Sequence, residues 1–150
     1  MALYYLDTSA LVKLYIREPG TDRMLRLAGR PAGNQLAVLA LAQVEFRSAL
    51  RRRERMGDID RLAATDLIEL FTRHLDTKFV RRSVNDVVLE TASGLVDRYP
   101  LRAYDAVQLA GCLALKTTTG DAGPTFVCSD RQLLEAAESE GLPLLDPTDP

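Results

Sequence analysis

The segment Ala2-Leu3-Tyr4-Tyr5-Leu6-Asp7-Thr8-Ser9-Ala10-Leu11 near the start of the chain holds the clearest structural signal in the sequence. Its first five residues form a short apolar run that ends sharply at Asp7-Thr8-Ser9. Apolar residues then recur with helical spacing until Glu18-Pro19-Gly20 interrupts the pattern. The segment therefore predicts a strand, a tight turn and a helix.

The same alternation continues along the rest of the chain. Short apolar runs predict further strands at residues 35–39, 79–80, 125–128 and 142–145. Longer amphipathic stretches predict helices at residues 21–29, 42–56, 58–75, 87–99, 103–116 and 130–140, with a loop at 117–124. Strands that alternate with helices indicate parallel βαβ units. We therefore expect an α/β fold in three layers, with a central parallel sheet of four to five strands and one domain over residues 1–150.

Two long helices at residues 42–56 and 58–75 are expected to form a hairpin around Gly57. The apolar residues expected to face the core are Val44, Phe46, Ala49 and Leu50 in the first helix and Ile59, Leu62, Ala63, Leu67, Leu70 and Phe71 in the second.

Composition limits the classes of protein to which the chain could belong. Of its 150 residues, 47% are hydrophobic and 27% charged, as in an average globular domain, so disorder is not expected. A net charge of −2 argues against indiscriminate coating of nucleic acid. No apolar run approaches the roughly 20 residues of a membrane-spanning helix, and residues 1–7 do not resemble a signal peptide. We expect a cytoplasmic protein with no membrane partner.

Histidine and cysteine are too scarce for two common kinds of active site. The sequence has one histidine, His74, and two cysteines, Cys112 and Cys128. A closed zinc site would need four such ligands, and a Ser-His-Asp triad could use His74 alone. We expect His74 to be a solvated surface residue and both thiols to be buried and reduced. If the protein is an enzyme, its working groups are therefore carboxylates.

Four acidic residues fall where predicted strands end and helices begin. Asp7 and Asp130 follow strands, whereas Glu45 and Asp105 lie in or near the first turn of helices. In α/β sheets ligands bind outside the carboxyl ends of the strands, so we expect these four side chains to converge there within reach of a metal ion.

Each acid alone could be no more than a helix cap, since acids favour helix N-termini. Four together are costly, because two unit charges 4 Å apart repel by about 4 kcal/mol at an effective dielectric near 20. Arg102 is the only obvious compensating cation at such a junction. A divalent cation would resolve the conflict, and all-oxygen ligands favour Mg²⁺ or Mn²⁺.

The segments Leu6-Asp7-Thr8-Ser9-Ala10-Leu11-Val12-Lys13, Arg102-Ala103-Tyr104-Asp105-Ala106-Val107 and Cys128-Ser129-Asp130-Arg131-Gln132-Leu133, with Glu45 between the first two, resemble the motifs of PIN-domain nucleases. The likeness is strongest to VapC-type toxins of toxin–antitoxin pairs. It implies an endoribonuclease that depends on Mg²⁺ or Mn²⁺ and cleaves tRNA, rRNA or mRNA.

The resemblance also implies roles for individual residues. Asp7, Glu45, Asp105 and Asp130 would be the catalytic and metal-binding acids, and Ser9 would support Asp7 by a hydrogen bond. The family resemblance further implies a homodimer and a small antitoxin that covers the groove. The 117–124 loop departs from the family pattern, and we expect its Asp121 to be a solvated loop residue.

Arginines on the 42–56 helix are candidate phosphate contacts. Arg47 and Arg51 on this helix, together with Arg102, are the predicted RNA-binding residues, and Arg52, Arg53 and Arg55 lie on the same helix. An ordinary basic helix C-terminus explains these helical arginines equally well.

Other functions remain as alternatives. A haloacid-dehalogenase-type phosphatase needs a second Asp two residues after the first, where this chain has Ser9. A receiver domain needs an acid pair at the first strand, which the chain lacks. A stand-alone PIN-domain nuclease in RNA processing stays open, as does a catalytically silent module that binds RNA or protein.

Overall fold

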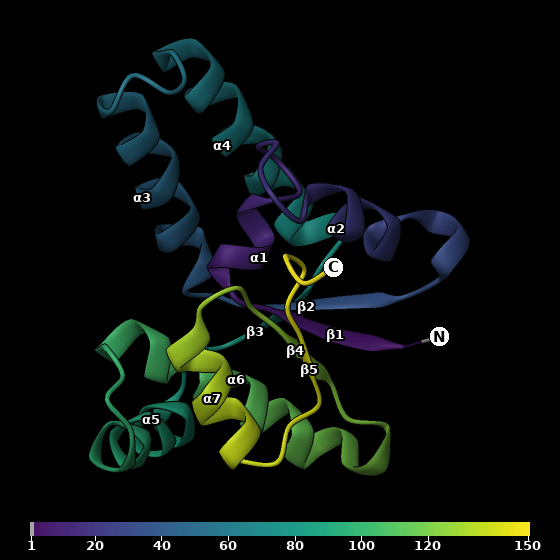
Figure 1. The fold of residues 1–150 in the computed structure, drawn as a ribbon, viewed down its shortest axis with the longest axis vertical. Coiled ribbons are helices and arrows are strands. Elements are labelled where there is room, and N and C mark those ends of the chain that lie inside the picture. Colours follow the sequence, from purple (N-terminus) through teal and green to yellow (C-terminus); the bar gives the residue numbers. More distant parts are fainter. Residues whose placement is uncertain (1) are drawn as a thin grey trace.

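The computed structural model describes residues 2–150, which form an α/β/α sandwich around a five-stranded parallel sheet of order β3-β2-β1-β4-β5 (Figure 1). The strands are β1 (Leu3–Leu6), β2 (Gln35–Leu39), β3 (Val80–Arg82), β4 (Thr125–Val127) and β5 (Leu144–Leu145). The helices are α1 (Thr8–Val12), α2 (Thr21–Ala28), α3 (Ala42–Arg55), α4 (Arg61–Thr77), α5 (Asp86–Arg98), α6 (Ala103–Thr119) and α7 (Arg131–Ser139), with 3₁₀ turns η1 (Arg30–Ala32) and η2 (Gly120–Ala122). The predicted fold class is confirmed.

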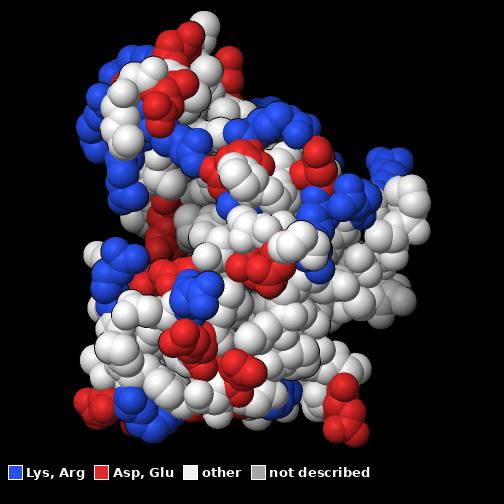
Figure 2. Space-filling model, viewed as in Figure 1, with Lys and Arg blue, Asp and Glu red and all other residues white. Residues whose placement is uncertain are grey.

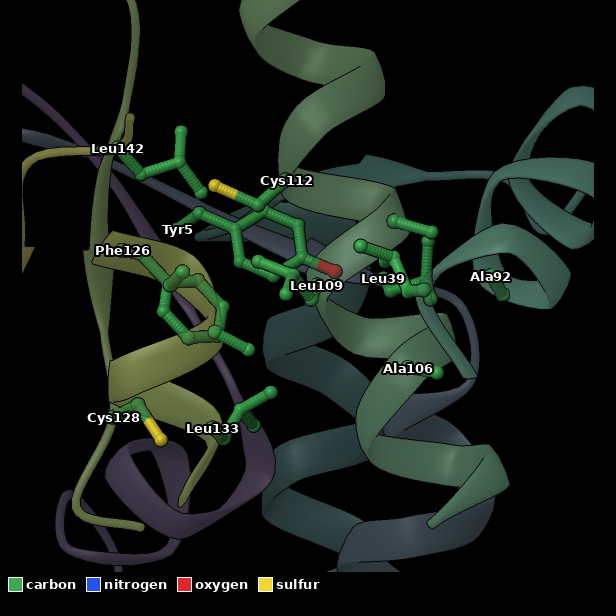
Figure 3. Close-up of a cluster of buried hydrophobic side chains, with 14 of the residues drawn as sticks. Tyr5, Leu39, Ala92, Ala106, Leu109, Cys112, Phe126, Cys128, Leu133 and Leu142 are labelled. Carbon is green, nitrogen blue, oxygen red and sulfur yellow. The ribbon is translucent and has the colours of Figure 1, made fainter. Parts of the chain in front are cut away.

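The two faces of the sheet carry different helices. Helices α1 to α4 cover one face and α5 to α7 cover the other (Figure 1). Successive strand residues point to opposite faces, so Tyr5 packs into the α5–α7 layer and Leu6 into the α1–α4 layer. The Tyr5 ring stacks on Phe126 among the buried side chains of the α5–α7 layer (Figure 3).

The strands end in register at one edge. Tyr5 is paired with Ala37 of β2 and with Phe126 of β4, so β1, β2 and β4 reach their carboxyl ends together. The backbone N–H of Asp7 still donates to the carbonyl of Val127 at 3.1 Å. Residues that follow these strands therefore meet at a common edge.

The helical hairpin forms as predicted, but part of its expected core face is wrong. Phe46, Leu50 and Phe71 are buried, whereas the side chains of Val44 and Leu62 are 66% and 72% exposed. Helix α4 instead buries Ala64, Ile68, Phe71 and Leu75. Leu62 lies near the tip of the hairpin, which projects away from the sheet, so no second layer covers it (Figure 1).

The loop predicted at residues 117–124 is also wrong at its start. Helix α6 continues to Thr119 and is followed by the turn η2. The hydroxyls of Thr117 and Thr119 donate to the carbonyls of Leu113 and Leu115, at 3.1 and 2.9 Å, and so remain compatible with the helix. Asp121 is exposed, as expected.

Along residues 2–150 no helix combines the length and apolarity that a bilayer crossing requires.

Candidate active site

The four predicted carboxylates line one cavity of about 830 Å³ at the carboxyl edge of the sheet. Asp7 and Glu45 come from the α1–α4 layer, whereas Asp105 and Asp130 come from the other layer. The space-filling view shows acidic side chains in the hollow between the α3–α4 hairpin and helices α5 to α7 (Figure 2). The expectation that these four acids converge at the carboxyl edge of the sheet is therefore confirmed.

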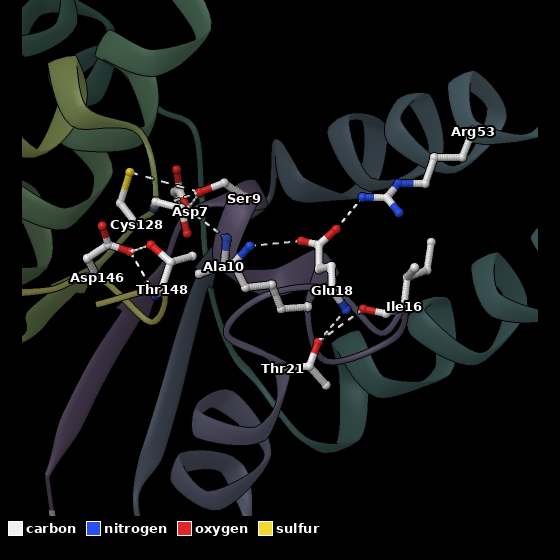
Figure 4. Close-up of polar contacts among 12 residues, drawn as sticks. Asp7, Ser9, Ala10, Ile16, Glu18, Thr21, Arg53, Cys128, Asp146 and Thr148 are labelled. Carbon is white, nitrogen blue, oxygen red and sulfur yellow. Dashed lines mark hydrogen bonds and ion pairs between the residues drawn. The ribbon is translucent and has the colours of Figure 1, made fainter. Parts of the chain in front are cut away.

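Asp7 is both a helix cap and a buried carboxylate facing this cavity. Its Oδ1 accepts from Ser9 Oγ at 2.7 Å and from the backbone N–H of Ala10 at 3.0 Å (Figure 4). Burial raises the pKa of Asp7 to about 6; these two hydrogen bonds oppose the rise and the charge of Glu45 adds to it. The hydrogen bond predicted between Ser9 and Asp7 is present.

A buried amide holds Glu45. Gln108 Nε2 donates to Glu45 Oε1 at 2.6 Å, and Thr8 Oγ1 donates to the same oxygen at 2.9 Å. Burial raises the pKa of Glu45, the two donors lower it, and Asp105 raises it further. The hydroxyl of Tyr5 donates to Gln108 Oε1 at 3.0 Å. Since Oε1 is occupied as an acceptor, the amide presents its N–H groups to Glu45 and favours the ionised carboxylate.

Arg102 is the cation shared by the other two acids. Its Nε donates to Asp105 Oδ2 at 3.3 Å, and its Nη2 lies 4.0 Å from Asp130 Oδ2. Burial raises the pKa of Asp105, Arg102 opposes that rise, and Asp130 adds to it. Asp130 also caps α7, accepting from the N–H of Leu133 at 3.3 Å.

The acids share the cavity without forming a ready-made metal cage. Among residues 2–150, no three Asp, Glu, His or Cys side chains are grouped tightly enough to hold a metal ion. The expectation that all four lie within metal-coordination reach is therefore wrong for this conformation. Asp7 and Glu45 are turned to hydroxyl and N–H donors, and Asp105 is turned to Arg102.

The donor chemistry nevertheless fits Mg²⁺ or Mn²⁺. All four groups offer carboxylate oxygens, the ligands these ions prefer. Burial, and to a smaller extent the neighbouring acids, raise the pKa values of Asp7, Glu45 and Asp105, and a bound cation would stabilise their charged forms. The guanidinium of Arg102, beside Asp105 and Asp130, already supplies part of this positive charge.

Several residues of the cavity were not predicted. Gln108 lies one helical turn after Asp105 in an otherwise apolar stretch of α6, a position that could have marked it in the sequence. Lys13, Glu18, Arg52 and Arg53 also line the cavity. Arg52 and Arg53 lie on the helix whose arginines are candidate phosphate contacts, but no sequence pattern points to Lys13 and Glu18, because their positions depend on how α1 and α3 pack.

The three predicted RNA-binding arginines lie in different surroundings. Arg102 lines the cavity and its side chain is 82% exposed. Arg51 bonds Glu54 at 2.7 Å and Thr65 at 3.2 Å, which joins α3 to α4 outside the cavity. Arg47 is exposed and does not line the cavity. Their roles in RNA binding stay predictions.

The expectation of a solvated surface histidine is wrong. His74 is partly buried, and its Nδ1 lies 2.7 Å from the hydroxyl of Tyr15, whose ring packs against Phe46 and Phe71. Cys112 and Cys128 are free and buried, as predicted. Burial raises the pKa of both thiols, so neither supplies a thiolate near neutral pH.

Comparison with known proteins agrees with this geometry. The family model described as PIN domain matches residues 4–139. The chain belongs to the PIN domain family. This PIN domain is 32% identical over 149 residues to Ribonuclease VapC46 of Mycobacterium tuberculosis, and the match covers 99% of the chain and 100% of that protein.

Solved structures share the fold of this PIN domain. VapBC2 from Rickettsia felis, bound to a DNA fragment from its promoter, superposes with a TM-score of 0.63 at 13% identity over 95% of this chain and 97% of that one. VapBC-1 from nontypeable Haemophilus influenzae gives 0.63 at 15% identity over 98% and 99%. At these identities the likeness concerns the fold alone.

Proposed function

We propose that this PIN domain is an endoribonuclease that depends on Mg²⁺ or Mn²⁺, hydrolyses RNA phosphodiester bonds and acts as the toxin of a toxin–antitoxin pair. The observation that carries the proposal is the gathering of Asp7, Glu45, Asp105 and Asp130 from both layers into one cavity. Full-length similarity to a protein named Ribonuclease VapC46 supports RNA as the substrate.

The metal would be held by Asp7 and Asp105, with Glu45 and Asp130 completing the set. When bound, Mg²⁺ or Mn²⁺ would polarise a phosphoryl oxygen and make a bound water easier to deprotonate. The protein's own part is to hold the carboxylates. Ser9 and the Ala10 N–H hold Asp7 in position, whereas Gln108 and Thr8 hold Glu45 through hydrogen bonds that favour its ionised form.

Hydrolysis needs no histidine or cysteine in this arrangement. Water attacks the phosphorus atom and its proton passes to a carboxylate, while the bond to the leaving ribose oxygen breaks and that oxygen takes up a proton from solvent. Burial raises the pKa values of Glu45 and Asp105, which makes each a stronger base than an exposed carboxylate. Arg102, beside Asp105 and Asp130, is placed to offset the negative charge of an incoming phosphate.

An antitoxin and a second copy of the chain are the partners we propose. Two of the solved neighbours, from Rickettsia felis and Haemophilus influenzae, are described as VapBC proteins, and a third, from Klebsiella pneumoniae, is described as a toxin–antitoxin complex. An exposed carboxylate cavity would need restraint in its own cell, and a peptide Arg could supply charge-assisted hydrogen bonds to these acids. We therefore expect a small antitoxin encoded beside this chain.

The test compares the purified protein with Asp105→Asn and with Asp121→Asn, a matched change of an exposed residue outside the cavity. We expect RNA cleavage in Mg²⁺ or Mn²⁺ by the unchanged protein and by Asp121→Asn, and none by Asp105→Asn or in EDTA. Cleavage that persists in EDTA would contradict metal dependence. A chain that is harmless when expressed without its neighbour would contradict the toxin role and leave the nuclease role standing.

A further inference from the structure

Besides the four acids, the cavity contains a second cluster of charged side chains, which the proposed chemistry does not use. Lys13 is only 6% exposed, and its Nζ lies 2.9 Å from Glu18 Oε1. The other carboxylate oxygen of Glu18 is bonded to Arg53 of α3 (Figure 4). Burying a lysine is costly unless its charge is compensated. The ion pair with Glu18 compensates the charge of Lys13 and holds its side chain in one position. We call Lys13, Arg52 and Arg53, which all line the cavity, its basic end.

Helices α1 and α3 both lead from the acids to the basic end. Each begins where a strand ends, with Asp7 at the start of α1 and Glu45 in the first turn of α3. Lys13 follows Asp7 by six residues and Arg53 follows Glu45 by eight. At a rise of 1.5 Å per residue, the backbone positions within each pair are about 9 and 12 Å apart along the helix axes. The two cations therefore lie beyond the acids along both walls of the same cavity.

The wall between the two ends is lined by small side chains. On α3, Glu45, Ala49 and Arg53 are spaced by four residues and form one stripe of the helix facing the cavity. Ser48 lies beside Ala49 and also lines the cavity. Such side chains leave room for a polymer backbone to pass from the acidic end to the basic end.

The distribution of charge fits a polyanion. The basic end has three cations against the carboxylates of Glu18 and Asp58, whereas the acidic end has four carboxylates against Arg102. The space-filling view shows basic side chains along the hairpin above the acidic hollow (Figure 2). An RNA strand whose scissile phosphate lies at the acids needs cations beyond them to hold its neighbouring phosphates.

We propose that the basic end binds an RNA backbone phosphate next to the scissile one, with Lys13, Arg52 and Arg53 as its ligands. Glu18 orients Lys13 and Arg53 in the free protein and competes with the phosphate for them. This proposal rests on the proposed ribonuclease function. Because phosphate contacts carry no base identity, the basic end contributes affinity for RNA of any sequence.

The test measures RNA binding separately from cleavage. A fluorescently labelled single-stranded RNA is titrated by anisotropy with the Asp105→Asn protein, alone and combined with Arg53→Ala or Glu18→Gln, at several KCl concentrations. Arg73→Ala is the matched control, since Arg73 lies on the neighbouring helix α4 and is exposed outside the cavity.

Arg53→Ala is expected to weaken RNA binding about tenfold, the scale of one charge-assisted hydrogen bond. It should also reduce the slope of log affinity against log salt by about 0.7, the value for one phosphate on a single strand. Glu18→Gln should tighten binding, because it removes the competing charge and keeps the shape. Arg73→Ala should leave affinity and slope almost unchanged. In the cleavage-competent protein that retains Asp105, Arg53→Ala should raise KM more than it lowers kcat.

Two outcomes would overturn the proposal. One is RNA affinity unchanged by Arg53→Ala, including the case in which antitoxin affinity falls instead, which would make the basic end a protein contact. The other is Glu18→Gln weakening RNA binding at an unchanged melting temperature, which would make Glu18 a required part of the RNA site. If Arg53→Ala does not fold, Arg53→Gln replaces it. Failure of the unchanged protein to cleave RNA would refute the ribonuclease, whereas cleavage with unaltered binding in these variants would refute the basic end alone.

Discussion

At the scale of single residues, two carboxylates of the site combine roles that the sequence analysis treats as alternatives, a helix cap and a cavity residue. Asp7 caps α1, which is a structural role, and it also lines the cavity, where it can take part in the chemistry. Asp130 does the same for α7. A cap fixes the carboxylate in position, since the helix N–H groups that it satisfies are rigid. The fold thereby orients an acid at no additional cost in side-chain entropy.

Asp7→Asn is expected to stabilise the metal-free protein at pH 7. Its folded pKa of about 6 lies above the ordinary 3.8, so the stability contributed by the neutral form is complete below pH 3.8 and is lost as pH rises through 6. Both hydrogen bonds end on Oδ1, which Asn retains. We expect a gain of up to about 3 kcal/mol in the free energy of unfolding at pH 7.

Urea unfolding in EDTA between pH 3.5 and 7.5 measures this effect. The two proteins should be equally stable near pH 3.5 and diverge as pH rises, while RNA cleavage is lost. Asp7→Ala is the control, because it also removes the ionisation but loses the cap, worth about 1 kcal/mol. A loss of stability at pH 7 in Asp7→Asn would contradict the expectation.

Gln108→Leu is expected to slow cleavage without a matching loss of RNA affinity. The change removes the closest donor to Glu45, so the pKa of Glu45 should rise and the acidic limb of the pH–rate profile should move to higher pH. We expect kcat to fall about tenfold at pH 7 with KM almost unchanged, in line with the loss of one hydrogen bond to a charged group.

Tyr5→Phe removes only the hydroxyl that orients the amide. A smaller shift of the profile in the same direction is expected. If Gln108→Leu lowers the rate equally at every pH, the amide acts on folding and not on Glu45.

At the scale of elements, local signals in the sequence were sufficient for the strands and insufficient for several helix faces. The strand at residues 35–39 has the predicted bounds, and the other strands differ by one or two residues at one end or, for β3, at both ends. Helix α4 buries Ala64 and Ile68 in place of the predicted Leu62 and Ala63. The buried side of a helix depends on the neighbour against which it packs, and that neighbour is set by tertiary structure.

The same distinction separates the predicted and unpredicted parts of the site. Asp7, Glu45, Asp105 and Asp130 follow strand ends or open helices, so their meeting follows from a parallel sheet. Gln108 needs the knowledge that α6 faces Glu45 across the cavity. The Lys13–Glu18–Arg53 group needs the packing of α1 on α3, which no local pattern encodes.

Gly111→Ala is expected to be destabilising because α6 lies very close to the hydroxyl of Tyr5. A Cβ at Gly111 would be 2.4 Å from Tyr5 Oη and 2.9 Å from Leu39 Cδ1. Forcing a methyl group into this packed core should cost about 1–3 kcal/mol and displace the hydroxyl that orients Gln108. Thermal unfolding measures the first effect and kcat the second.

Gly94→Ala on α5 is the matched control. A Cβ there meets only the end of the Arg98 side chain, at 3.3 Å. The change should stabilise the protein by about 0.5–1 kcal/mol, since alanine favours a helix interior. Equal effects of the two changes would show that the contact between Tyr5 and α6 is not tight.

At the scale of the whole molecule, the site exists only when both layers are in place. Asp7 and Glu45 belong to one layer and Asp105 and Asp130 to the other, and 123 positions separate the first acid from the last. An unfolded chain therefore lacks the site. A ligand that bridges the acids binds the folded protein alone and must stabilise it.

Mg²⁺ or Mn²⁺ is accordingly expected to raise the melting temperature. At a free metal concentration of a hundred times Kd, mass action contributes about 2.7 kcal/mol, which for a domain of this size is roughly 5–10 °C. In Asp105→Asn the rise should be much smaller, although this variant should melt higher than the unchanged protein in EDTA because a partly buried carboxylate, whose charged form burial disfavours, is gone. Asp121→Asn should respond to metal as the unchanged protein does. Calorimetric melting curves across a metal titration provide the measurement, and an equal rise in Asp105→Asn would place the bound metal away from the four acids.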